Sequence, residues 1–127
     1  SAADYRILPR APQAVARAWT RAAHAQASPR ISGTNTPLKI YEQLASGVPL
    51  VATRIHSHTQ VLDDTVAYLA APDAESFAAA LIAALRDGRE GNPRAAAARR
   101  LYEERYARPV YERKLRAALA RVEVCAA

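Results

Sequence analysis

The chain has 127 residues, half of them hydrophobic, which is enough apolar material for one globular core. No apolar run approaches the roughly 20 residues of a membrane-spanning helix. The single cysteine, Cys125, excludes an intrachain disulfide and a thiolate metal cage. The formal net charge of +6 favours anionic partners without choosing between nucleotides, nucleic acid and an acidic membrane surface. We expect one cytoplasmic domain, and the start in mid-pattern at Ser1 suggests a truncated or processed product.

In the first third of the chain, the residue pattern predicts a strand, a helix and a second extended segment. Residues 3–8 are compatible with a short strand, and Val15 and Trp19 then recur at helical spacing on one face. Residues 27–31 form the next extended segment, and residues 32–36 are a polar loop.

A helix is predicted directly after this loop. Pro37 is a natural first helical residue, and Thr36 stands at the N-cap position before it. Gly47 stands where a residue in the left-handed conformation ends a helix.

Two buried strands follow. Residues 49–53 are almost continuously apolar, as in a strand covered on both faces of a parallel sheet, and residues 66–70 repeat the pattern. Between them we expect a loop at residues 55–59 and a brief helical turn at Val61 and Leu62.

The last third of the chain is helical. Asp73 is the expected cap of a helix that Gly88 ends, and two basic helices follow, divided at Pro109. The apolar positions at helical spacing in these three helices are Phe77, Leu81, Leu85, Leu101, Tyr102, Tyr106, Tyr111, Leu115, Ala118 and Val122. Strands that alternate with helices through short loops indicate an α/β fold with a parallel sheet.

The polar loop occupies the place where such folds bind ligands, at the carboxyl end of a strand and before a helix. Gly33 lets the backbone approach a ligand closely, and the N–H groups of the first helical turn favour a diphosphate. The residues assigned to this site are Gly33, Thr34, Asn35, Thr36, Leu38 and Lys39.

Glu42 is the candidate for a ribose. It comes six residues after Thr36, roughly 9 Å along a helix at 1.5 Å per residue, about the reach from a diphosphate to its ribose. A carboxylate accepts hydrogen bonds from two adjacent hydroxyls with its two oxygens. The alternative is an ordinary loop and helix cap, with Lys39 and Glu42 forming a surface ion pair at spacing three.

Two segments resemble the donor-site segment of group 1 (family 4) glycosyltransferases: SPRISGTNTPLKIYE at residues 28–42 and LASGVPLVAT at residues 44–53. The similarity continues through HTQVL at residues 58–62 and covers about residues 28–115. The stretch before Ala22 resembles the family only weakly.

The resemblance implies a GT-B architecture, in which two Rossmann-like three-layer domains face a cleft. Residues 1–127 would be a partial C-terminal nucleotide-sugar-binding domain of bacterial type that ends in the two basic helices. The N-terminal domain, which would bind a glycan, lipid or small-molecule acceptor, is absent from the chain. The resemblance leaves room for peripheral membrane association of the full-length enzyme.

The chemistry that the resemblance implies is retaining transfer from a nucleotide-diphosphate sugar, without a metal or other cofactor. The loop from Gly33 to Thr36 would meet the diphosphate and the sugar, and Glu42 would meet the ribose hydroxyls. His58 and Thr59 would lie near the donor cleft, and a structural role in holding their loop stays open for both.

The sequence departs from the family in two ways. Many members have a second glutamate eight residues before the ribose-binding one, where this chain has Thr34. The upstream Arg and Lys that clamp the diphosphate have no counterpart, since Arg6, Arg10 and Arg17 cannot be assigned to that role by position. No catalytic residue is assigned, and the fragment alone is expected to be inactive.

Three other interpretations compete. A metal site at His56 and His58 would need a third ligand at matching spacing, so no metal is expected. The arginines of residues 94–121 suggest a basic nucleic-acid-binding module, but they alternate with glutamates and no aromatic platform accompanies them, so no specific nucleic acid is expected. The third is a noncatalytic remnant that pairs with another subunit.

Overall fold

The computed structural model of the protein describes residues 4–126, except for the side chain of Ala126. Its centre is a parallel sheet of three strands in the order β1 (Gln26–Ser28), β2 (Leu50–Thr53) and β3 (Tyr68–Ala70). Gln26 pairs with Leu50, and Val51 pairs with Tyr68. Because all strands point the same way, their carboxyl ends meet at one edge of the sheet. The predicted α/β fold with a parallel sheet is confirmed.

The central strand shows why the sheet is covered on both faces. All four residues of β2 are buried, and their side chains alternate between two clusters. Leu50 and Ala52 pack in the larger cluster with Ile40 and Leu44, whereas Val51 packs in the smaller one. The nearly continuous apolar run at residues 49–53 therefore predicted its burial correctly.

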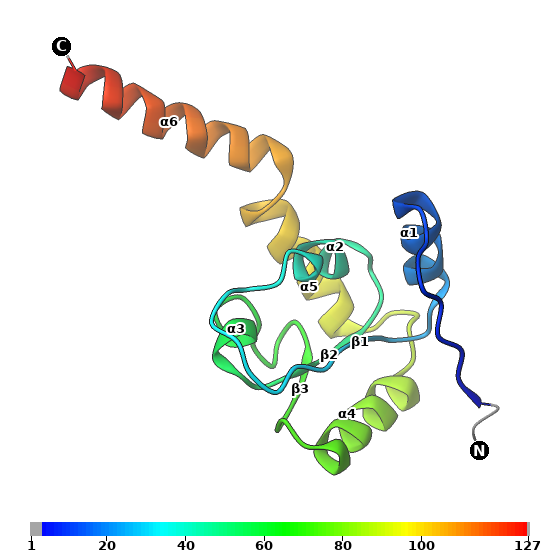
Figure 1. Ribbon diagram of the computed structural model, residues 1–127. Coiled ribbons are helices and arrows are strands. Elements are labelled where there is room, and N and C mark those ends of the chain that lie inside the picture. Colours follow the sequence, from blue (N-terminus) through cyan, green and yellow to red (C-terminus); the bar gives the residue numbers. More distant parts are fainter. Residues whose placement is uncertain (1–3, 127) are drawn as a thin grey trace.

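Helices form the two outer layers. On one face lie α2 (Lys39–Ala45) and α5 (Pro93–Arg105), which contact each other, and on the other lies α4 (Ala74–Asp87), which packs on β2 and β3. Figure 1 shows α2 and α5 above the sheet and α4 below it. The short helix α3 (His56–Thr59) connects β2 to β3. The segment that contains His56 and His58 is thus a helical turn rather than the expected loop.

The ends of α4 follow their local sequence. The Asp73 carboxylate accepts a hydrogen bond from the Ser76 N–H at 2.8 Å, and Gly88 ends the helix with a φ of 76°. Phe77 and Leu81 pack against the smaller cluster, but Leu85, the third member of the predicted stripe, is exposed. The predicted helix is correct, and its buried face is shorter than the spacing suggested.

The two basic helices at the end are also present. The second, α6 (Arg108–Ala126), follows α5 after a break of two residues and extends away from the sheet in Figure 1. Its predicted apolar positions, among them Tyr111, Leu115 and Val122, are exposed. None of the described helices is long and apolar enough to cross a membrane.

The start of the chain differs from expectation. Of the strand expected at residues 3–8, Ala3 lies outside the described residues, and residues 4–8 form no strand and are exposed. The helix α1 (Gln13–Ala22) is present but has no buried residue, and Val15 and Trp19 on its apolar side are 40% and 48% exposed. A strand needs a neighbour for its backbone hydrogen bonds, and no described strand lies beside residues 4–8.

Candidate functional site

The polar loop lies where the sequence placed it, between the carboxyl end of β1 and the start of α2. Gly33 has a φ of 143°, a conformation that side chains rarely adopt. Gln60, just after α3, fixes the loop, because its Nε2 donates to the Thr34 carbonyl at 2.9 Å and its Oε1 accepts from the Thr36 hydroxyl at 3.0 Å. The loop backbone is therefore held in one conformation by a residue from the next crossover.

The contact with Gln60 changes the role of Thr36. The expected N-cap is not formed, since α2 begins at Lys39 and no side chain caps it. The preceding residues make a tighter turn, in which the Ile40 N–H donates to the Pro37 carbonyl at 3.0 Å. The prediction of Thr36 as cap and Pro37 as first helical residue is wrong, because the Thr36 hydroxyl is used across the loop instead.

His58 lies at the centre of a buried hydrogen-bond network. Its side chain has 0% exposure, and its Nδ1 is 2.8 Å from the carbonyl oxygen of Thr53 and 3.1 Å from the Thr53 hydroxyl. Its Nε2 is 3.2 Å from the hydroxyl of Ser28. The carbonyl can only accept, so Nδ1 carries the proton and Nε2 accepts from Ser28. The imidazole thus joins the carboxyl ends of β1 and β2.

Burial controls the ionisation of this imidazole. It lowers the pKa of His58, an effect that the hydrogen bond to Thr53 opposes and the charges of Arg30 and Lys39 reinforce. The neutral ring, with both nitrogens hydrogen-bonded, therefore holds Ser28 and Thr53 in place next to the loop. Thr59 is exposed and donates to the Ile55 carbonyl within its own turn.

Metal binding has no structural basis among the described residues. His56 is exposed while His58 is enclosed, and no group of three or more His, Cys, Asp or Glu side chains in residues 4–126 is arranged to hold an ion.

Glu42 projects from α2 and is paired, but not with Lys39. Its Oε1 accepts hydrogen bonds from the Arg17 guanidinium at 2.9 Å and from the Gln13 amide at 3.2 Å, both donors coming from α1. The hydrogen bond from Arg17 lowers the pKa of Glu42, and partial burial opposes the shift. The carboxylate is therefore ionised at neutral pH, and Oε2 accepts no hydrogen bond from the described residues.

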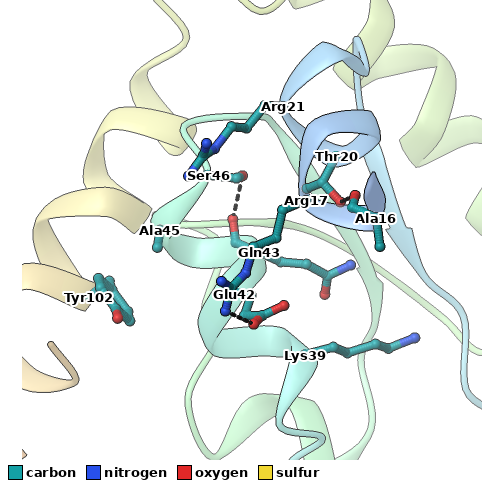
Figure 2. A pocket seen from close by; sticks show the side chains of 10 residues that line it. All are labelled: Ala16, Arg17, Thr20, Arg21, Lys39, Glu42, Gln43, Ala45, Ser46 and Tyr102. Carbon is teal, nitrogen blue, oxygen red and sulfur yellow. Dashed lines mark hydrogen bonds and ion pairs between the residues drawn. The ribbon is translucent and has the colours of Figure 1, made fainter. Parts of the chain in front are cut away.

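Beside this carboxylate is an open pocket of about 440 Å³. Figure 2 shows Arg17 reaching Glu42 from α1, Arg21 extending from the same helix, and Tyr102 on α5. Three cationic side chains and one carboxylate line the pocket, so it favours a polar, anionic ligand. It is lined by Ala16, Arg17, Thr20, Arg21, Lys39, Glu42, Gln43, Ala45, Ser46 and Tyr102.

Of the residues assigned from the sequence, Lys39 and Glu42 line the pocket. The others are not among its lining residues, and Leu38 is 83% exposed; they are Gly33, Thr34, Asn35, Thr36, Leu38, His58 and Thr59. The sequence reasoning missed Gln60, and nothing in its spacing from the loop indicates the contact. It also missed Arg17 as the partner of Glu42, because 25 residues separate the two.

The arginine-rich helices make pairs along their own surfaces. Arg99 pairs with Glu103 at 3.2 Å and Arg108 with Glu112 at 2.8 Å, each four residues apart. Pairs at this spacing are typical of solvated helix faces. The arrangement does not favour a nucleic-acid interface on these helices.

Comparison with known proteins identifies the family of the chain. A family model described as glycosyl transferases group 1 matches residues 3–87, which is more than half of the chain. The search of curated proteins found no match. The chain therefore belongs to the group 1 glycosyltransferases.

Proposed function

We propose that this chain is the donor-binding domain of a retaining glycosyltransferase and that it binds a nucleotide-diphosphate sugar. The observation that carries the proposal is an ionised carboxylate, Glu42, at the wall of a cationic pocket, in the first turn of the helix that follows the glycine-containing loop. In this proposal the domain is the C-terminal half of a GT-B architecture, and a second Rossmann-like domain would bind the glycan, lipid or small-molecule acceptor.

Glu42 would bind the ribose. Its Oε1 is occupied by Arg17 and Gln13, which orient the carboxylate and keep it charged. Ribose hydroxyls would donate to Oε2, which accepts no hydrogen bond from the described residues. Charge-assisted hydrogen bonds of this kind are roughly twice as strong as neutral ones.

The loop would bind the diphosphate and the sugar. Because Gln60 already holds the Thr34 carbonyl and the Thr36 hydroxyl, binding would cost little loop ordering. As the bond to the sugar breaks, negative charge grows on the leaving diphosphate, and prearranged backbone and cationic donors stabilise it. The assignment of Gly33, Asn35 and Lys39 to the diphosphate and of Thr34 to the sugar belongs to this proposal, as does transfer without a metal or other cofactor.

Binding measurements on Glu42 variants test the proposal. ADP, GDP and UDP are titrated into the protein by calorimetry, together with their 2′-deoxyribose counterparts. Glu42→Ala is expected to weaken the preferred nucleotide by about 1.5–3 kcal/mol, roughly tenfold to a hundredfold, and Glu42→Gln somewhat less. The 2′-deoxy nucleotide should bind wild type more weakly, yet lose little more in Glu42→Ala.

Glu104→Ala is the matched control, since Glu104 is an exposed glutamate on α5 outside the Glu42 pocket. It should leave nucleotide affinity unchanged. If correctly folded Glu42→Ala protein binds nucleotides as tightly as wild type, Glu42 has no part in the site and the proposal loses its main residue.

A further inference from the structure

A second cation lies on the loop itself. Arg30 follows β1 by two residues, and its Nη1 donates to the Asn35 carbonyl at 3.3 Å. A Cβ atom added to Gly33 would lie 2.6 Å from Nη2 and 2.9 Å from Cζ of this guanidinium. The group therefore rests directly on the loop backbone, in space that is open only because residue 33 is a glycine.

The backbone of Arg30 is anchored as firmly as its side chain. Its N–H donates to the Thr53 hydroxyl at 3.2 Å, across the gap between the ends of β1 and β2. Thr53 is 3% exposed and is held by His58 through the 2.8 Å contact to its carbonyl. The buried network thus positions the backbone of Arg30, and the Asn35 carbonyl positions its guanidinium.

The charge of Arg30 is not neutralised within the described residues. No carboxylate in residues 4–126 lies within ion-pair distance of it, and its guanidinium makes one hydrogen bond, to Asn35. A guanidinium has five N–H donors in a planar fork that matches phosphate oxygens. The charges of Arg30 and Lys39 also contribute to the lowered pKa of His58, after its burial, so both cations lie near the ends of β1 and β2.

The geometry points to Arg30 as the side chain that binds the diphosphate at the Gly33 loop. Arg6, Arg10 and Arg17 could not be assigned to this role from their positions in the sequence. This inference rests on the proposed function, because it names a residue of the same donor site. Arg17 pairs with Glu42, and Arg6 and Arg10 lie in the exposed segment before α1. Arg30 comes from the strand end itself, so its position depends on the sheet rather than on another segment.

The test compares ligands that differ only in the phosphates. Affinities of a nucleoside diphosphate, the matching nucleoside and inorganic pyrophosphate are measured for wild type, Arg30→Gln and Arg30→Lys. In Arg30→Gln the nucleoside diphosphate and pyrophosphate should bind roughly tenfold or more weakly, while the nucleoside binds within about twofold of wild type. Arg30→Lys should bind the nucleoside diphosphate and pyrophosphate more tightly than Arg30→Gln but less tightly than wild type. Lysine keeps the positive charge but lacks the planar fork of N–H donors.

The control is Arg86→Gln, a change of an exposed arginine in the last turn of α4, on the opposite face of the sheet. It should leave all three affinities unchanged. An equal loss of nucleoside and nucleoside diphosphate in Arg30→Gln would show a deformed loop and overturn the inference. Unchanged diphosphate affinity in that variant would overturn it as well.

The outcome for wild type separates this inference from the proposed function. If pyrophosphate binds and depends on Arg30, but the nucleoside part adds no affinity, the anion site stands and the nucleotide-sugar proposal fails. If nucleoside diphosphates bind and depend on Glu42 but not on Arg30, the proposed function stands and this inference fails. If wild type binds none of the phosphates, both fail.

Discussion

The candidate site has a buried side and an exposed side, and hydrogen bonds of similar length hold both. On the buried side, Ser28, Thr53 and His58 join the ends of two strands with no more than 3% of any side chain exposed. On the exposed side, Arg17 holds Glu42 at 2.9 Å, with about half of each side chain in solvent.

The difference lies in what breaking each contact would cost. A buried polar group that loses its partner is left without water to replace it, whereas an exposed ion pair exchanges its partner for solvent at little cost. The joined strand ends are therefore the rigid part of the site. The contact of α1 with Glu42 can yield to a ligand, because α1 has no buried residue.

The largest expected effect is on the buried side. His58→Ala should lower the free energy of unfolding by about 2–4 kcal/mol, because it leaves the Ser28 hydroxyl unpaired, removes one of the two hydrogen bonds to the Thr53 carbonyl and opens a cavity. Urea unfolding followed by circular dichroism measures it. His56→Ala on the same short helix is the control, and it should stay within about 0.5 kcal/mol of wild type since His56 is exposed. Equal losses in the two variants would contradict the network.

The lowered pKa of His58 predicts how the stability of the protein changes with pH. The folded-state pKa of His58 lies below the ordinary value of 6.5, so on acidification the unfolded chain takes up the proton first. Stability that is complete above about pH 6.5 should therefore fall as the pH drops below it. In His58→Gln this part of the pH dependence should disappear. A wild-type stability that does not change between pH 7.5 and 5.5 would rule out the depressed pKa.

An intermediate effect is expected where Gln60 holds the loop. Gln60→Ala removes two exposed hydrogen bonds and should cost about 0.5–1 kcal/mol of stability. Its clearer sign is local, since the backbone N–H order parameters of residues 33–36, measured by NMR relaxation, should fall while those of α4 do not change. Thr59→Ala, next to Gln60 but bonded only within its own turn, should leave the loop unaffected. Loop order parameters that are the same in both variants would refute the role of Gln60.

The smallest effect is expected on the exposed side. Arg17→Ala should change the free energy of unfolding by less than about 1 kcal/mol, because the pair it removes is half exposed. It should instead loosen α1, which carries the only tryptophan of the chain, Trp19. Lower fluorescence anisotropy of Trp19 checks this, and high salt should produce the same change in wild type. If Arg21→Ala, one turn further along α1, has an equal effect, the Arg17 contact is not what holds the helix.

The sequence by itself determined the features that depend on neighbouring residues. Asp73 caps α4 and Gly88 ends it, because a cap bond spans three residues and a left-handed turn needs only a glycine. The apolar run of β2 required cover on both faces, and the structure supplies it. The loop between β1 and α2 followed from the same alternation of elements.

Only the tertiary structure decided which side chains meet at the site. His58 reaches Ser28 across 30 residues, Gln60 reaches Thr34 across 26, and Arg17 reaches Glu42 across 25. Local spacing favoured Thr36 as a cap and offered Lys39 as an alternative partner of Glu42, and in both cases a distant residue took the contact. The physical reason is that parallel strands bring their carboxyl ends together only after a crossover. Partners there are therefore chosen by the packing of helices on the sheet, which no short stretch of sequence encodes.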